Sequence, residues 1–420
     1  MRAACPPALP PCGELRGGPG KSRDLASDFH PKIGRGCVLE DFLRKSLSFF
    51  RGFPKTQARQ NRKNKTTHFV SHHENEFTSE TGRKLTRQVI VLTIAALALS
   101  TSTGSRAEEL CNCMTTWIGG TGDWFTLSNW TSVGPPSCGG SVCSPLAGGA
   151  QGFINNGGTA QISSQTQIAF ACALILGQNS GDSGRVSVNH GTLTMCGVIG
   201  VGSHGRGGMS ITNGGVVNMA YAGASIASFA GSHGSVTVDG VNQDGTKSQL
   251  MGSGPIYLGG AVDGPGGDGL LTVTNGAKVT ATNIHVYASG TLTGNSTVTV
   301  TTTSGTTVEG TLEPSSGRLT VGGNLNFVTT TALMQCNVVP ASADNVYVSG
   351  GAASLTGRLK VRMTGAFTPG TTYTLLHCDS PLIGTFSSVS INYPTCQCFT
   401  PVITYDANNV YLYLESEPCC

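Results

Sequence analysis

A short unit recurs in the middle of the chain and restricts the folds that the sequence can adopt. The unit is Gly, one further residue, an apolar residue, Ser or Thr, and a second apolar residue, followed by a polar pair and usually Gly. It occurs as GRVSVNHGTL at 184–193, GGMSITNGGV at 207–216, GSVTVDGVN at 234–242 and GLLTVTNGAKV at 269–279. Intervals of 23, 27 and 35 residues separate the copies. A period of this size in a β-rich chain is typical of a solenoid, in which one coil cannot bury its apolar side alone.

Apolar residues alternate with Ser or Thr inside each copy. Side chains of a strand point to opposite faces in alternation, so the apolar positions are expected to face the inside of a tube. The Gly and Asn residues after each strand suit the left-handed or tight conformations of a corner. The sequence therefore predicts two interior columns, formed by Val186, Met209, Val236 and Leu271 and by Val188, Ile211, Val238 and Val273.

The predicted fold is an all-β, right-handed parallel β-helix. With about 4.8 Å between coils, some dozen coils would form a rod on the order of 60 Å long. An antiparallel β-sandwich is the competing architecture, because strand patterns alone do not fix which strands pair.

Charge is divided unevenly along the chain. Residues 1–107 contain 18 of the 26 Lys and Arg and 8 of the 23 Asp and Glu, a net charge of +10. Residues 108–420 contain 8 basic and 15 acidic residues, a net charge of −7. The two parts are therefore expected to be two different kinds of polypeptide segment joined end to end.

The segment at 83–107 has the organisation of a signal peptide. A basic start at Arg83 precedes an apolar run from Val89 to Leu99, and small residues surround the end of the segment. This pattern predicts cleavage between Ala107 and Glu108. An uncleaved anchor is the alternative, but the run is shorter than the roughly 20 residues that a membrane-spanning helix needs. We therefore expect no integral membrane span in the mature chain.

Residues 1–82 show no sustained strand or helix period. We expect them to be disordered, or to result from a start codon assigned too early, with an extended signal sequence as the alternative. Their basic charge is no evidence for nucleic acid binding, and no nucleic acid partner is expected.

Twelve of the 15 cysteines follow the predicted cleavage site. An even number in an exported chain favours disulfides, because the periplasm and the cell exterior are oxidising. Cys138 and Cys143 would close a small Gly-rich loop, whereas the other pairings stay open. The close pairs lack the repeated two-residue spacing of zinc sites, so neither a metal nor another cofactor is expected.

Several stretches resemble the passenger region of bacterial autotransporters. WIGGTGDWFTLSNWTSVGPP at 117–136 is similar to the opening of many such passengers, with Trp117, Trp124 and Trp130 in place. Four later stretches resemble the closing coils of a passenger in the expected order, and the resemblance covers nearly all of 117–414. These stretches are GTLEPSSGRLTVGGNLNF at 310–327, ADNVYVSGGAASLTGRLKV at 343–361, PGTTYTLLHCDSPLIGTFSSV at 369–389 and PVITYDANNVYLYL at 401–414.

The resemblance implies an organisation for the exported chain. It comprises an N-terminal cap with the first coils at 108–173, β-helix repeats at 174–340, the closing passenger coils at 341–415 and a tail at 416–420. Two features depart from the family: the chain ends soon after Leu414 without a translocator barrel, and it is rich in cysteine. We therefore expect a passenger-like solenoid lacking its barrel, which is a truncated or split gene product or a periplasmic or secreted protein in its own right.

Gly181 to Gly184 read GDSG, which looks like the sequence around the nucleophile of trypsin-like serine proteases. Ser183 would then need a His base and an orienting Asp. The mature chain contains no His before Asp182, and His190 follows too closely to serve as the base. The four residues occupy the place of the HGRGG turn in the next copy, so we predict a corner and not a nucleophile.

A carbohydrate-active β-helix enzyme, a lyase or a hydrolase, is the alternative function. Such a site needs carboxylates gathered on one face. Only Asp263 and Asp268, in DGPGGDG, lie close together in the sequence, and they form a weak calcium candidate. His204 and His233 precede equivalent strands and could stack on adjacent coils, but a ligand set would need a third donor, so we expect solvated turn residues. No segment matches the full Gly-x4-Gly-Lys-Ser/Thr pattern of a phosphate-binding loop.

The expected function is that of an exported, non-enzymatic, adhesin-like protein. Its Ser-, Thr- and Asn-rich outer faces and corner loops would bind host or environmental glycans or proteins, with specificity in the loops. The family resemblance places it in the periplasm, on the cell surface or outside a Gram-negative bacterium. Function here rests on family analogy. A truncated remnant of an autotransporter is a further alternative.

Overall fold

The computed structural model describes residues 113–131, 134–136, 150–220, 222–395 and 397–418. The predicted N-terminal extension, the signal peptide with its Ala107–Glu108 cleavage site, and the candidate pair Cys138 and Cys143 lie outside these residues.

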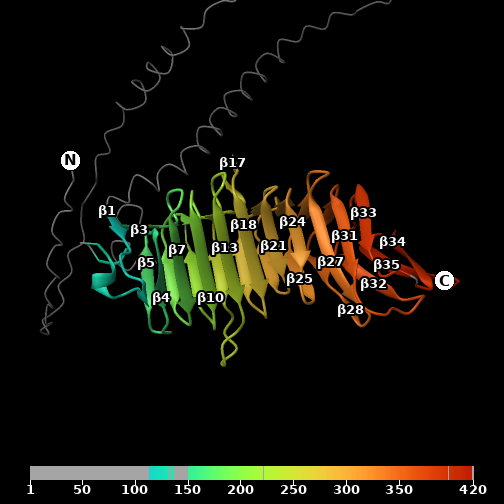
Figure 1. The fold of residues 1–420 in the computed structure, drawn as a ribbon, viewed down its shortest axis with the longest axis horizontal. Helices are drawn as coiled ribbons and strands as arrows, with labels where there is room; N and C mark the ends of the chain where they lie inside the picture. Colours follow the sequence, from blue (N-terminus) through green and yellow to red (C-terminus); the bar gives the residue numbers. More distant parts are fainter. Residues whose placement is uncertain (1–112, 132–133, 137–149, 221, 396, 419–420) are drawn as a thin grey trace, which may run out of the picture. The chain divides into compact units, whose positions relative to one another are not determined.

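Strands dominate the described chain and form three long sheets (Figure 1). Sheet 1 has ten strands: β1 (Cys113–Thr116), β3 (Ala150–Ile154), β6 (Ala173–Leu176), β9 (Ile199–Val201), β12 (Ala224–Ile226), β15 (Ile256–Leu258), β20 (Ile284–Val286), β23 (Thr306–Val308), β26 (Leu325–Phe327) and β30 (Ala353–Leu355).

Sheet 2 has twelve strands: β2 (Thr121–Asp123), β4 (Asn156–Ile162), β7 (Ser183–Asn189), β10 (Arg206–Thr212), β13 (His233–Asp239), β18 (Asp268–Thr274), β21 (Gly290–Gly294), β24 (Thr311–Pro314), β27 (Leu333–Val339), β31 (Arg358–Met363), β33 (Ser388–Asn392) and, beside β27, β28 (Ser342–Ala343).

Sheet 3 has eleven strands: β5 (Ile168–Ala171), β8 (Thr192–Met195), β11 (Val216–Met219), β14 (Gln249–Gly252), β19 (Lys278–Ala281), β22 (Thr297–Val300), β25 (Arg318–Gly322), β29 (Asn345–Ser349), β32 (Thr372–Cys378), β35 (Asn409–Ser416) and β34 (Phe399–Tyr405). The other elements are the hairpin of β16 (Gly260–Ala261) and β17 (Gly264–Pro265) and the 3-10 helix η1 (Leu127–Asn129).

The chain visits the three sheets in turn, and one strand from each makes a coil. For example, β6, β7 and β8 are followed by β9, β10 and β11, and each strand pairs in parallel with its counterpart in the next coil (Figure 1). This arrangement is a parallel β-helix, so the predicted fold class is confirmed and the antiparallel sandwich is not the architecture. The right-handed sense follows the strong preference of parallel crossover connections.

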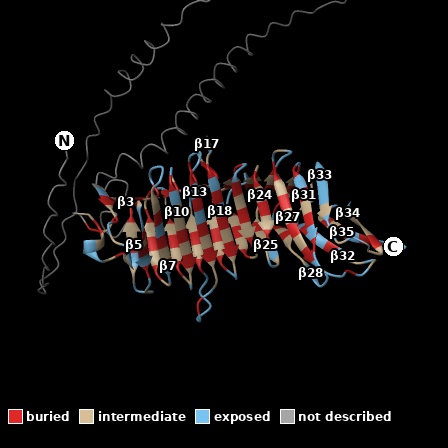
Figure 2. Cartoon of the chain, viewed as in Figure 1, coloured by how far each residue is buried: buried red, intermediate tan, exposed pale blue. Residues whose placement is uncertain are grey.

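The register places the predicted interior columns in line. Met209 pairs with Val186 on one side and with Val236 on the other, and Val236 pairs with Leu271. All eight column residues are buried, and buried and less buried residues alternate along these strands (Figure 2). The two-residue alternation in the sequence therefore sets which side of sheet 2 faces the core.

The intervals between copies differ because the corners differ in length. An extra loop at 240–248 follows β13, and the β16–β17 hairpin lies between β15 and β18. The side chain of Asn242 stabilises the first loop, because its Oδ1 accepts hydrogen bonds from the backbone N–H groups of Asp244 and Thr246. Strands on both sides of these insertions stay in register.

In the four repeat copies, the corner after the strand of sheet 2 uses a left-handed residue, as the sequence predicts. Asn213 and Asn275 have φ of 52° and 53°, and Gly240 has φ of 78°. His190 takes the same conformation in the first copy, with φ of 66°. Gly and Asn adopt this region more readily than other residues.

The first glycine of the unit is required for a steric reason. Gly184, Gly207, Gly234 and Gly269 point inward at the narrow corner between sheets 1 and 2, and an added Cβ on any of them would collide with backbone atoms of a neighbouring corner. Glycine therefore permits the sharp bend of each coil.

Aromatic side chains close both ends of the core. Trp117, Trp124 and Trp130 are buried at the first coil, and the Trp130 ring lies edge-on to the other two. At the far end, Phe367 packs against Tyr373 and Phe399. Here the parallel stacking ends, since β35 pairs antiparallel with both β32 and β34.

Candidate functional site

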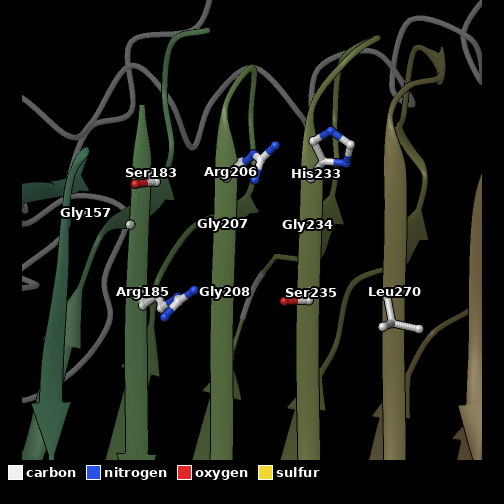
Figure 3. Close-up of a pocket in the computed structure, with 11 residues that line it drawn as sticks. Gly157, Ser183, Arg185, Arg206, Gly207, Gly208, His233, Gly234, Ser235 and Leu270 are labelled. Atoms are coloured by element: carbon white, nitrogen blue, oxygen red, sulfur yellow. The ribbon is translucent and has the colours of Figure 1, made fainter. Parts of the chain in front are cut away.

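A shallow groove of about 550 Å³ crosses β4, β7, β10, β13 and β18 near the first residues of the last four strands (Figure 3). It lies on the outer face of sheet 2, within the repeated units. The residues that line it are Gly157, Ser183, Gly184, Arg185, Arg206, Gly207, Gly208, His233, Gly234, Ser235 and Leu270.

Strand register brings the polar groups of the groove together. Ser183, Arg206 and His233 share one row across β7, β10 and β13, and Asp268 of β18 continues it. Neighbouring strands lie about 4.8 Å apart, so residues 85 positions apart in sequence lie within three strands of one another on one face. The groove is therefore a product of coil stacking.

The Arg185 side chain occupies space that Gly208 leaves open. A Cβ on Gly208 would lie 3.3 Å from Cγ and 3.7 Å from Nε of Arg185, and Figure 3 shows the arginine beside this glycine. Arg185 and Arg206 are both exposed. In the described part of the chain, neither guanidinium group has an ion-pair or hydrogen-bond partner, so both can bind a ligand.

His233 is held by a carboxylate of the next coil. Its Nδ1 lies 3.0 Å from Oδ2 of Asp268, and the two side chains are 51% and 72% exposed. A contact this exposed contributes little to stability. Its effect is to orient the imidazole and to leave Nε2 available to a ligand.

The groove has a basic character in a part of the chain that is acidic. Two guanidinium groups and one imidazole line the groove, and the imidazole contacts the carboxylate of Asp268, whereas residues 108–420 carry a net charge of −7. Guanidinium groups match carboxylate and sulfate oxygens with directed N–H donors. The arrangement can therefore bind an anionic group, with the hydroxyls of Ser183 and Ser235 as additional partners.

The surroundings of Ser183 agree with a corner. Ser183 begins β7, and Oδ2 of Asp182 accepts hydrogen bonds from the backbone N–H and the side-chain amide of Asn179, both at 2.9 Å. His190 lies beyond the opposite end of β7. His233 is two coils away, roughly 9.6 Å, which is beyond the hydrogen-bond reach that a general base needs.

The structure separates the two calcium candidates. Asp268 contacts His233 on the outer face of sheet 2. Asp263 lies in the β16–β17 hairpin, where its charge adds to burial in raising the pKa of Tyr257. Among the described residues no group of three or more His, Cys, Asp or Glu has the geometry to hold a metal ion.

His204 does not join His233. Its ring instead stacks on Phe229 of the next coil, with ring centroids 4.0 Å apart, and its Nδ1 lies 3.1 Å from the carbonyl oxygen of Gln178. His204 thus ties neighbouring corners together.

A second cluster on sheet 1 holds the β16–β17 hairpin. His285 stacks on Tyr287 with centroids 4.0 Å apart and contacts Glu309, with Nε2 to Oε1 at 3.0 Å. The Tyr287 hydroxyl donates a hydrogen bond to the carbonyl oxygen of Ala261 at 2.8 Å. Sequence reasoning missed this cluster, because its members lie in coils outside the recognised repeat copies.

Two cysteines contradict the expectation that the cysteines after the predicted cleavage site form disulfides. Cys336 and Cys378 are free and buried inside the tube. Burial raises the pKa of Cys336 well above its ordinary value and raises that of Cys378 to about 12. They behave as small apolar core residues.

A scan against protein-family models finds no match for the chain, and a search of curated proteins finds none either. Across the described ranges, no helix has the length and apolar character needed to cross a membrane.

Proposed function

We propose that the mature chain is an exported, non-enzymatic, adhesin-like protein that binds an anionic ligand in the groove of sheet 2. The observation that carries this proposal is the placement of Arg185, Arg206 and His233 on three successive coils. All three line one solvent-facing groove, and both arginines are free of protein partners in the described chain. Host or environmental glycans that bear carboxylate or sulfate groups suit this chemistry.

Export is supported by the sequence alone. The basic and apolar segment before Ala107 fits a signal peptide, and the passenger-like stretches fit a protein that acts outside the cytoplasm. The β-helix agrees with this resemblance, because the passenger regions that the sequence resembles are expected to form such solenoids. Specificity would come from the groove and from the corner loops beside it.

Binding is tested with the full chain on an array of charged and neutral glycans. Arg185→Gln and Arg206→Gln should each weaken binding of anionic glycans by about tenfold, as expected for a lost charge-assisted hydrogen bond. Lys247→Gln is the matched control, because Lys247 is an exposed cation in the 240–248 loop. Equal binding by the groove variants and the control would refute the groove assignment.

Export is tested separately by producing the chain in a Gram-negative host and fractionating the cells. The exported form should begin at Glu108 on N-terminal sequencing. Recovery only in the cytoplasm, or a start far upstream, would contradict the signal peptide.

A further inference from the structure

The outer face of sheet 2 carries most of the positive charge of residues 108–420. Five of the eight Lys and Arg in this part project from that face, although the part as a whole has a net charge of −7. They form two groups: Arg185 and Arg206 at the groove, and Arg358, Lys360 and Arg362 on β31.

The three cations of β31 face outward because the residues between them are buried. Leu359, Val361 and Met363 fill the core, so Arg358, Lys360 and Arg362 follow one another at about 6.6 Å along the strand. Their register partners on β27 and β33 are all uncharged: Leu333, Gln335 and Asn337 on one side and Ser388, Ser390 and Asn392 on the other.

A single register row joins the two groups. The row begins at Arg185 on β7 and ends at Arg358 on β31. Between them, each residue pairs with the next across β10, β13, β18, β21, β24 and β27. Seven strand steps correspond to about 34 Å. The strands lie side by side in this order (Figure 1), and the residues between the two arginines are Gly208, Ser235, Leu270, Thr291, Thr311 and Leu333.

This row contains three hydroxyl side chains and two leucines, and it has no charge between its ends. Its hydroxyl groups can bond to sugar hydroxyls, and its two leucines offer apolar contacts to the C–H faces of sugar rings. The carboxylates on this face lie on other rows: Asp268 contacts His233, Asp239 accepts hydrogen bonds from Thr274 and Asn275, and Glu313 accepts one from Gln335.

We infer that a long anionic polysaccharide lies along this row, across the strands, and bridges the two basic groups. The inference rests on the proposed function and extends it by naming the polymer and its direction. A chain that spans both groups binds the second one intramolecularly, so its affinity should exceed that of a short fragment by about tenfold or more.

The test measures binding of the full chain to size-fractionated polygalacturonate and heparin by calorimetry. The two probes distinguish carboxylate from sulfate recognition. Affinity should rise in a step once fragments exceed about 34 Å. Both the Arg185→Gln/Arg206→Gln variant and the Arg358→Gln/Lys360→Gln/Arg362→Gln variant should lose this step, whereas Lys247→Gln/Lys278→Gln should keep it. Unchanged thermal unfolding would show that each variant is folded.

A variant in the middle of the row provides an independent measurement. Thr311→Glu adds a negative charge between the groups and should weaken the binding of long fragments while leaving the binding of short ones unaffected. Thr311→Gln is its neutral control.

Groove-dependent binding without a length step would overturn the bridging inference and leave the proposed function standing. Binding that ignores Arg185 and Arg206 would overturn the proposed function itself. Tighter binding of single-stranded DNA of equal charge would overturn the assignment to a polysaccharide.

Discussion

Gly207 approaches the corner at Gly202 so closely that a methyl group on Gly207 would collide with the Gly202 backbone nitrogen. Gly207→Ala should therefore lower the free energy of unfolding by about 3 kcal/mol, because backbone cannot move aside as a flexible side chain can. The midpoint of urea unfolding, followed by circular dichroism, measures the loss.

The next residue is the control for this prediction. A methyl group on Gly208 would face outward and approach only the Arg185 side chain, at 3.3 Å. Gly208→Ala should change stability by no more than about 0.5 kcal/mol. Equal effects of the two substitutions would contradict the assigned inward and outward directions.

The tryptophan cap should hold the first coils in place. Trp124 is 1% exposed, and its carbonyl oxygen accepts a hydrogen bond from Nε1 of Trp130 at 2.7 Å. Trp124→Ala should cost about 3–5 kcal/mol through the cavity that it leaves. Hydrogen exchange should accelerate most in β3 and β4. Acceleration spread evenly to β31 would argue against a local cap.

One buried hydroxyl should be dispensable. Thr306 is fully buried, and its Oγ1 has no hydrogen-bond partner among the residues that the structure describes. Thr306→Val keeps the shape and removes the unsatisfied oxygen, so it should stabilise the fold by about 1 kcal/mol. Differential scanning calorimetry would detect this as a higher melting temperature. A lower melting temperature would mean that the hydroxyl has a partner in solution.

Two exposed aspartates should make the last strands sensitive to acid. The backbone N–H of Gly350 and then the Tyr347 hydroxyl lower the pKa of Asp379, and the backbone N–H of Asn408 and then the Asn409 side chain lower that of Asp406. A lowered folded-state pKa contributes stability above the ordinary carboxyl pKa of about 4, which is lost as pH falls through the folded value.

The melting temperature of the wild type should therefore fall as the pH drops below about 4. Asp379→Asn and Asp406→Asn should each be less stable near neutral pH and show a shallower decline in acid. Parallel pH profiles for wild type and variants would rule out this origin of acid sensitivity.

The two core thiols should be unreactive in the folded protein. Burial raises the pKa of Cys378 to about 12, and Cys336 is wholly buried. Because the thiolate is the reactive form, N-ethylmaleimide at pH 8 should spare both residues until denaturant is added. Peptide mapping by mass spectrometry identifies the labelled sites, and labelling of either residue under native conditions would contradict its placement in the core.

The repeat determined much of the fold in advance, because its alternation and its corner residues both depend on local chemistry. Val186, Met209, Val236 and Leu271 fall in one column as the sequence predicts. The groove needed more information. The sequence pattern predicts a solvated turn residue at His233, although alignment of the copies already places it opposite Arg206.

The remaining features depend on register over many coils. Arg358 lies outside the recognised copies, so no repeat alignment relates it to Arg185. The pairing of β35 with β34 and β32 is set by chain reversal at the end of the stack. Cysteine number alone could not distinguish core thiols from crosslinked ones, because burial depends on which face of a strand each residue occupies.

The reversal at β35 also bears on self-association. A parallel stack that simply stopped would offer an unpaired strand edge to another molecule, and repeated addition at such an edge builds filaments. In sheet 3, β35 covers the edge of β32, and β34 then adds a strand of opposite direction. A chain cut before Phe399 would lose this cover, and the exposed edge of β32 would then be available for pairing with another molecule.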